Sequence, residues 1–228
     1  MMHSGRAAGA ALKLILLALG GLLALLLAGW IAKNIGTGIL AITWVLVGLW
    51  AVFAIFTFYF FRDPDPTVPI GANLVVSPAH GKVDVMDTIN EPEFMGGECQ
   101  RISVFLSVID IHVQNAPVAG RVAFSKYTSG QFMSALKTES AAHNENCLIG
   151  FDSIETAGAK VGVRLIAGVL ARRIVPFVAV GDFMKRGERI SLIQFGSRTD
   201  IYLPKSAKIK IKMGDRVVGG ETVIAVFE

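Results

Sequence analysis

The chain has 228 residues, of which 53% are hydrophobic and 18% charged, and its mean hydropathy is +0.55. This composition excludes a disordered protein and is too apolar for an ordinary soluble domain. Residues 1–61 contain three basic residues and no acidic ones, which leaves 19 basic and 18 acidic residues from Arg62 onward. The formal charge of +4 therefore comes mostly from the N-terminal segment. It gives no argument for nucleic-acid binding, which requires a basic face on the folded domain.

Two long apolar runs predict a membrane anchor over residues 1–61. Residues 14–32 and 38–61 contain no charged side chain, and each run is long enough for a helix to cross roughly 30 Å of hydrocarbon. Trp30 and the aromatic residues at 58–61 lie near the ends of the runs, as interfacial belts do. The short break between the runs predicts an antiparallel helical hairpin. A cleaved signal peptide is the rival interpretation of the first run, but a second span follows at once and no small-residue cleavage site is evident.

The few charges near these runs predict their orientation. Arg6 and Lys13 precede the first run and Arg62 follows the second, whereas Lys33 alone lies between them. The positive-inside rule then predicts that both ends of the chain lie in the cytoplasm. The helices would be in the cell (inner) membrane. The only two cysteines are too few for a disulfide framework and would stay reduced there. The four histidines show no metal-ligand spacing, so no metal site is predicted.

Residues 62–228 read as a β-rich domain. Three prolines between positions 64 and 69 predict a stiff, extended linker from the membrane to this domain. Short β-branched runs bounded by Gly, Pro and Asp then predict strands. These runs cover residues 74–76, 101–109, 121–124, 173–180, 189–195, 208–213 and 222–227. Residues 157–171 fit either a strand or a helix.

Two turn motifs occur twice in the domain. The segment 77–83 (SPAHGKV) is echoed at 116–122 (APVAGRV), and 181–188 (GDFMKRGE) is echoed at 214–221 (GDRVVGGE). Glycine and aspartate at these positions favour tight turns before the next strand. The echoes predict a mostly-β, β-rich α+β fold with pseudo-repeated hairpins that resemble biotinyl- and lipoyl-carrier domains. The exposed tip lysine of a carrier domain is missing, so the carrier function itself is not indicated.

The most specific motif surrounds Gly196 and Ser197. On spacing alone this Gly-Ser pair would be a turn between two strands. The segment ERISLIQFGSRTDIYLP (188–204), however, resembles the processing site of the phosphatidylserine decarboxylase family in its short, single-domain form. Further segments match the same family in order: FFRDP (60–64), VVSPAHGKV (75–83), FLSVIDIHVQNAPVAGRV (105–122), GQFMSALKTES (130–140), IAGVLARRIV (166–175) and GDFMKRGERI (181–190). The resemblance covers roughly residues 60–228 and the preceding membrane segment.

The resemblance implies a pyruvoyl-dependent enzyme made as a self-processing proenzyme. The chain would cleave between Gly196 and Ser197, after attack of the Ser197 hydroxyl on the Gly196 carbonyl, into fragments 1–196 and 197–228. Ser197 would become a covalent pyruvoyl group, the only cofactor implied. That group would form a Schiff base with the amine of phosphatidylserine, which loses carbon dioxide to give phosphatidylethanolamine in phospholipid biosynthesis. The two fragments would form a heterodimer, and the family implies a dimer of these.

The resemblance also implies roles for two histidines. A lone histidine near apolar strands is usually structural, but His112 falls on the family pattern FLS-x-x-D-x-H and becomes the expected acid and base. His80 stands in SPAHG where the family has Asp, in SPADG. Three interpretations stay open: His80 acts as the base or orienting group, one of three nearby carboxylates (Asp84, Asp87 or Asp110) replaces the Asp, or the chain cleaves slowly or not at all.

Other departures and alternatives concern the substrate. The segments AHNEN (142–146) and HVQNAP (112–117) differ from the usual family segments, which points to divergence of substrate or function. Arg198, next to the cleavage site, is the candidate for binding the phosphate or carboxylate of the head group. The alternatives to phosphatidylserine decarboxylation are the same reaction on another serine phospholipid, such as an archaetidylserine-like ether lipid, or a non-catalytic lipid-binding relative.

Overall fold

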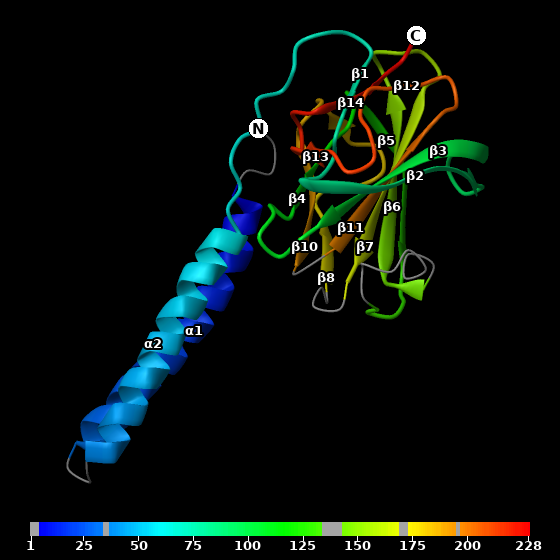
Figure 1. The fold of residues 1–228 in the computed structure, drawn as a ribbon. Coiled ribbons are helices and arrows are strands. Elements are labelled where there is room, and N and C mark those ends of the chain that lie inside the picture. Colours follow the sequence, from blue (N-terminus) through cyan, green and yellow to red (C-terminus); the bar gives the residue numbers. More distant parts are fainter. Residues whose placement is uncertain (1–4, 34–36, 134–142, 169–172, 195–196) are drawn as a thin grey trace. The chain divides into compact units, whose positions relative to one another are not determined.

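The structure is a computed structural model that describes residues 5–33, 37–133, 143–168, 173–194 and 197–228 (Figure 1). The chain forms two compact units, residues 5–63 and residues 64–228. The first unit is helical and the second is built of strands. Each unit is described by itself.

The helical unit is an antiparallel hairpin of α1 (Arg6–Ala32) and α2 (Thr37–Phe60). The indole nitrogen of Trp50 donates a hydrogen bond of 2.6 Å to the carbonyl of Ala18, which joins the two helices near their middle. Gly29 packs so closely on Thr43 that an added Cβ would lie 2.6 Å from the Thr43 methyl group. By length and composition both helices could cross a membrane, as the hydropathy of the sequence predicts.

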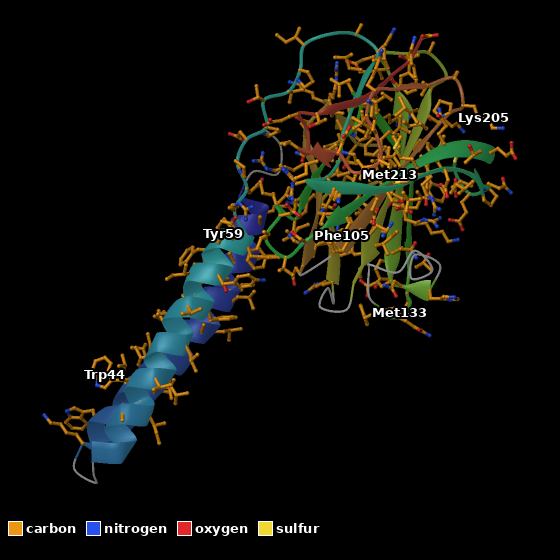
Figure 2. All side chains as sticks on the ribbon, in the orientation of Figure 1. Trp44, Tyr59, Phe105, Met133, Lys205 and Met213 are labelled. Atoms are coloured by element: carbon orange, nitrogen blue, oxygen red, sulfur yellow. The ribbon has the colours of Figure 1, made fainter. Side chains whose placement is uncertain are left out.

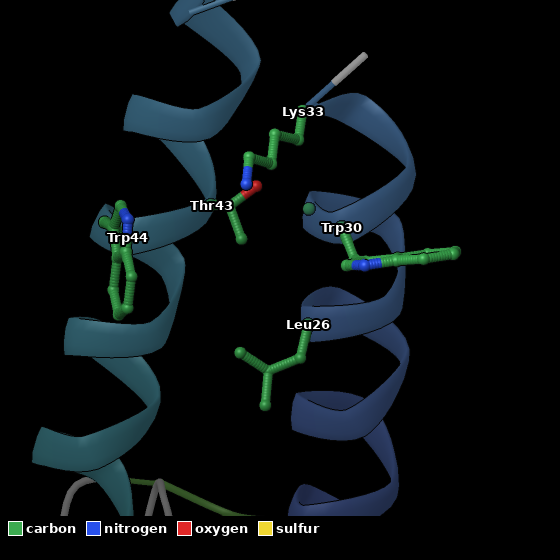
Figure 3. Close-up of a pocket in the computed structure, with 6 residues that line it drawn as sticks. Leu26, Trp30, Lys33, Thr43 and Trp44 are labelled. Carbon is green, nitrogen blue, oxygen red and sulfur yellow. The ribbon is translucent and has the colours of Figure 1, made fainter.

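A small hollow lies near the loop end of this hairpin (Figure 3). Lys33 extends along it toward Thr43, while Leu26 and Gly29 form its inner wall. The indole rings of Trp30 and Trp44 are 71% and 64% exposed, so they face the surroundings of the hairpin. Aromatic rings on the outer surface near one end of the helices are typical of a membrane interface.

The β unit consists of short antiparallel strands. They are β1 (Leu74–Val76), β2 (Gly81–Glu91), β3 (Gly97–Leu106), β4 (Val113–Asn115), β5 (Gly120–Thr128), β6 (Asn146–Ser153), β7 (Lys160–Ala167), β8 (Arg173–Pro176), β9 (Phe183–Met184), β10 (Arg189–Gln194), β11 (Ser197–Leu203), β12 (Lys208–Ile209), β13 (Arg216–Val217) and β14 (Val223–Val226).

These strands form one large and two small sheets in the described residues. The large sheet has eight strands in the order β13-β2-β3-β11-β7-β6-β5-β9 and curls into a half-barrel (Figure 1). The small sheets have the orders β1-β14-β12 and β4-β10-β8. The main hydrophobic core includes residues of all three sheets, among them Val104, Leu165, Ile190 and Ile224. The β-rich class predicted from the sequence is therefore confirmed.

Several strand lengths differ from the sequence expectation. The run 101–109 ends as a strand at Leu106, because the Asp110 carboxylate accepts hydrogen bonds from the Ser107 amide and hydroxyl and closes a turn there. The run 208–213 alternates lysine and isoleucine over its first five residues, and it is paired as a strand only over β12. Its lysines face solvent and its isoleucines are half-buried. The open segment 157–171 contains strand β7, and residues 169–172 lie outside the described residues.

The repeated motifs have equivalent structures. Asp182 and Asp215 each accept a backbone hydrogen bond of 2.8 Å from the residue three positions earlier. The amides of Val122 and Val83 then donate to the carbonyls of these same two aspartates. An added Cβ at Gly81 or at Gly120 would collide with a carbonyl of the neighbouring strand. The sequence echoes thus mark a real internal repeat.

The proline-rich segment after residue 63 lies along the two glycine-containing turns. Pro66 packs against Gly220, and Val68 packs against Gly187, so a side chain at either glycine would collide with the linker. The Thr67 amide donates to Glu221 Oε1 at 2.8 Å. Arg189, which is 1% exposed, is paired through Nη2 with Asp65 Oδ1 at 2.9 Å. The expected linker is therefore extended but bound to the β unit.

Candidate active site

Ser197 is the first residue of β11, the fourth strand of the eight-stranded sheet. It is paired with Leu106 of β3 on one side and with Ala167 of β7 on the other. Side chains alternate along a strand, so Ser197 shares a face with Thr199, Ile201 and Leu203. This is the core face, and all four residues are at most 1% exposed. Gly196, the other residue of the expected cleavage site, lies outside the described residues.

The Ser197 hydroxyl is buried, and no hydrogen-bond partner for it exists in the part of the chain that the structure describes. Thr199 Oγ1, two residues later on the same face, is in the same condition. An unpaired buried hydroxyl costs about 1–3 kcal/mol, so such groups are uncommon in folded proteins. A serine that reacts with the peptide bond before it needs an accessible lone pair on Oγ, and the residues present fit that requirement.

His112 lies at the end of the loop between β3 and β4 and is fully buried. Its carbonyl accepts from the Ile193 amide at 3.1 Å, which holds it beside β10, four residues before Ser197. Its Nδ1 is 2.9 Å from the carbonyl oxygen of Asp110. A carbonyl only accepts, so Nδ1 carries the proton, and in the neutral ring Nε2 carries the lone pair. This tautomer suits a base.

The Asp110 carboxylate organises the loop that holds His112. Oδ2 accepts from the amide and the hydroxyl of Ser107 at 2.9 and 2.6 Å, and Oδ1 accepts from Arg216 at 2.6 Å. Asp110 therefore orients His112 through its backbone carbonyl, while its carboxylate fixes the loop. Of the three carboxylates considered as replacements for the family Asp, this is the one whose backbone contacts His112.

His80 lies directly before β2, at the same end of the large sheet. Lys82 pairs with Phe105, so Gly81 lies opposite Leu106, which in turn pairs with Ser197. Gly81 and Ser197 are therefore two strand spacings, or roughly 10 Å, apart. The imidazole edge of His80 and the Asn115 carboxamide both lie against Gly219, each within 3.0 Å of the place a Cβ would take. His80 and the serine thus lie at the same end of the large sheet, separated by β3. Neither imidazole is hydrogen-bonded to Ser197 Oγ in this structure.

The end of β7 beside Ser197 is fixed by Asn144, a residue to which the sequence assigned no role. Asn144 is 1% exposed. Its Nδ2 donates to the carbonyl of Ala167 at 2.7 Å and to that of Met133 at 2.8 Å, and its Oδ1 accepts from the Met133 amide. The sequence signal that could have pointed to Asn144 is that its segment, 142–146, departs from the family pattern.

Arg198 points to the opposite face of the sheet from Ser197. It is 1% exposed, and its guanidinium is paired with Asp84 of β2, with Nη1–Oδ1 at 3.0 Å and Nη2–Oδ2 at 2.5 Å. Burial raises the pKa of the Asp84 carboxyl above its ordinary value, and this effect outweighs the attraction of Arg198. The candidate head-group ligand is therefore already bound to a carboxylate of the chain.

The same outer face carries further buried charges along β11. Asp200 is 1% exposed and lies 4.0 Å from Arg101, which is itself paired with Asp87 at 2.6 Å. Arg164 is 3.8 Å from Glu91. Burial raises the pKa of Asp200 above its ordinary value in spite of these arginines. The outer face is thus a charged network, and the core face carries the hydroxyls.

The two cysteines are poorly suited to chemistry at this site. Cys99 and Cys147 are buried and unbridged, and burial raises both thiol pKa values, that of Cys99 to about 11, so neither is a ready nucleophile. In the described ranges, no group of three metal-ligating side chains is placed to hold an ion.

By its geometry, this end of the sheet is a candidate self-processing serine site, in which a buried hydroxyl follows a glycine at the head of a strand. Comparison with known proteins agrees: residues 53–225 match the family model described as phosphatidylserine decarboxylase. The chain is 41% identical over 200 residues to the phosphatidylserine decarboxylase proenzyme of Symbiobacterium thermophilum, covering 86% of this chain and 92% of that protein. For the proenzyme of Desulfotalea psychrophila the identity is 39%, covering 79% and 83%. The chain belongs to the phosphatidylserine decarboxylase family.

The raised pKa of Asp200 generates a prediction for stability. The folded state holds the Asp200 proton more tightly than the unfolded state, so the free energy of unfolding falls as the pH rises from near 3.8 through the raised pKa. Asp200→Asn cannot ionise, so this fall should shrink. Circular dichroism of the detergent-solubilised chain, unfolded by denaturant at several pH values, measures it. Asp152→Asn, at an exposed carboxylate of β6, is the control, and equal pH dependence in wild type and Asp200→Asn would contradict the assignment.

Proposed function

We propose that this chain is a self-processing decarboxylase that converts phosphatidylserine to phosphatidylethanolamine in phospholipid biosynthesis. The observation that carries the proposal is the buried, unpaired hydroxyl of Ser197, directly after Gly196 in the sequence. The family relation supports the substrate, because the relatives are named phosphatidylserine decarboxylase proenzymes. We assign His112 as acid and base and place His80 in the same site.

The self-cleavage uses the chain's own groups. His112 Nε2 takes the Ser197 hydroxyl proton, Oγ bonds to the Gly196 carbonyl carbon, and the carbon–nitrogen bond breaks as the Ser197 nitrogen takes a proton. This leaves an ester between Gly196 and Ser197 Oγ. Loss of the Ser197 Cα proton then breaks the Cβ–Oγ bond and releases the Gly196 carboxylate. Addition of water to the remaining enamine, in its imine form, expels ammonia and leaves a ketone on residue 197.

Residues around position 197 then serve the decarboxylation. The pyruvoyl group, when formed, supplies an electron sink for the loss of the substrate carboxylate. Burial of residue 197 excludes water from the reacting atoms. His112, held by the Asp110 carbonyl, returns a proton to the substrate carbon after carbon dioxide leaves.

The two fragments, 1–196 and 197–228, are proposed to remain one heterodimer, and a dimer of these is proposed from the family. Fragment 197–228 supplies β11, β13 and β14, which pair with β1, β2, β3 and β7 of the other fragment, and β12, which pairs with β14. The backbone hydrogen bonds of β11 alone join it to two strands of the large fragment. Cutting the peptide bond before Ser197 leaves the pairing of residues 198–202 with both strands in place.

We further propose that residues 1–61 anchor residues 62–228 to the inner membrane with the catalytic domain in the cytoplasm. The apolar helices and the basic residues Arg6, Lys13 and Arg62 support this. The repeated turns support a relation of the β unit to biotinyl- and lipoyl-carrier domains.

Ser197→Ala should abolish cleavage and activity. The wild type should give a blocked fragment of 32 residues, 197–228, on denaturing gels and by mass spectrometry, whereas the variant stays at 24.4 kDa. The variant should fold normally, because the hydroxyl removed has no partner to leave behind. Thr199→Val, which removes the other unpaired hydroxyl of the same face, is the matched control and should still cleave. An intact, folded wild-type chain with decarboxylase activity would contradict the proposal.

Substitution of the histidines separates their roles. His112→Gln should slow cleavage by at least about 100-fold, because general base catalysis by a placed side chain contributes that much. The rate is measured as fragment release after synthesis. His80→Asp then distinguishes two cases. Faster cleavage would mean that having His80 in place of the family Asp partly impairs cleavage. Stopped cleavage would mean that His80 is an adapted catalytic group. An unchanged rate in His80→Asp would contradict a role for His80.

The proposed topology predicts the result of reporter fusions. A reporter fused after Glu228 should give a cytoplasmic signal, because the positive-inside rule places both ends there. A reporter inserted after Lys33, between the helices, should give the opposite signal. The reverse pattern would contradict the orientation.

A further inference from the structure

The Asp84–Arg198 pair joins two strands that are not neighbours. Arg198 is on β11 and Asp84 on β2, with β3 between them. In the register, Phe105 of β3 is opposite Arg198 on one side and opposite Lys82 on the other. The Arg198 side chain therefore crosses β3 to reach the carboxylate with two hydrogen bonds.

A β-bulge in β2 accounts for the position of Asp84. Val83 pairs with Val104 and Val85 with Ser103, so Asp84 is the extra residue of an irregularity in the register. Bulges re-aim side chains and occur next to active sites. The pair is bidentate, the geometry that fixes a guanidinium most firmly, and the Arg198 side chain is 2% exposed.

Resting on the proposed function, we propose that Asp84 and Arg198 form a clamp that positions residue 197 after self-cleavage. Cleavage turns Ser197, the first residue of β11, into a chain end, and chain ends fray. The clamp fixes β11 at Arg198, which directly follows residue 197. Because both side chains lie on the face opposite to Ser197, they act as positioning residues and do not touch the substrate.

The rival role for Arg198 is binding of the substrate phosphate or carboxylate. A hollow beside the pair makes this concrete, since it is lined by Asp84, Lys82, Phe105 and Met213. Figure 2 labels Phe105 and Met213 in the β unit. An anion entering there would have to displace the Asp84 carboxylate from a buried guanidinium. The two roles therefore give opposite expectations when Asp84 is removed. If the pair is a clamp, residue 197 is no longer positioned. If Arg198 binds substrate, its guanidinium becomes more accessible to the anion.

The first experiment compares kinetics of the full-length, detergent-solubilised variants Asp84→Asn, Arg198→Gln and the double variant. All three should still release the 32-residue fragment, because the peptide bond holds residue 197 until cleavage. In each, kcat should fall about 10- to 100-fold, with KM for phosphatidylserine in mixed micelles nearly unchanged, because a displacement near 1 Å is that costly. The double variant should be no worse than either single one, since all three remove the same pair.

Arg198→Lys, which keeps the charge but not the bidentate geometry, should give an intermediate kcat. Glu98→Gln is the matched control. It removes the exposed pair between Glu98 and Lys205 at the other end of β11 and should leave kcat unchanged.

The second experiment measures amide hydrogen exchange in the cleaved proteins and does not depend on activity. Exchange at residues 198–200 should become faster in Asp84→Asn than in wild type, while β6 stays protected and shows that the domain is folded. A raised KM in Arg198→Gln without a matching effect in Asp84→Asn, or unchanged exchange at 198–200, would overturn the clamp. A wild-type chain that never cleaves would instead overturn the proposed function, so the two failures are distinguishable.

Discussion

The site depends on the pairing of β11 on both sides. Its backbone is hydrogen-bonded to β3 and to β7 over almost its whole length, so the position of Ser197 is fixed by the sheet. The alternation of side chains then divides the strand between two environments. One face presents the hydroxyls of Ser197 and Thr199 to the core, and the other presents Arg198 and Asp200 to a network of buried charges. The candidate reactive residue thus lies on a strand that is paired on both sides.

Part of this fold could be predicted from the sequence because it rests on local patterns. Hydropathy was enough for α1 and α2, and the repeated Gly-Asp motifs were enough for the paired turns. The long strands β2 and β6 and the short strands β4, β9 and β13 were not among the predicted runs. In β2 a polar, bulged sequence hides the alternation that marks a strand. Strand β11 is buried along its whole length although it reads SRTDIYL, and its charged residues Arg198 and Asp200 meet opposite charges on β2 and β3.

The sequence alone nominates residues for the candidate site but does not predict how they are connected. Ser197, His112 and His80 come from segments far apart in sequence, and the register of the sheet brings Ser197 and His80 to one end. The roles of Asn144 and of the Asp84–Arg198 pair depend on contacts across 23 and 114 positions. No pattern within one segment reveals such contacts, since they arise only from strand order. The cleavage residue Gly196 lies outside the described residues.

The proline-rich segment after residue 63 packs on the β unit, and this affects how the two proposed fragments would stay together. Asp65 and Val68 contact residues of 1–196, whereas Pro66 and Thr67 contact Gly220 and Glu221 of 197–228. The proposed fragment 197–228 contains no apolar helix. Its retention at a lipid surface would then depend on noncovalent attachment, part of it to the very stretch that leaves the bilayer. A shortened chain that begins after this stretch would lose the membrane helices and one of the surfaces that hold its two pieces together.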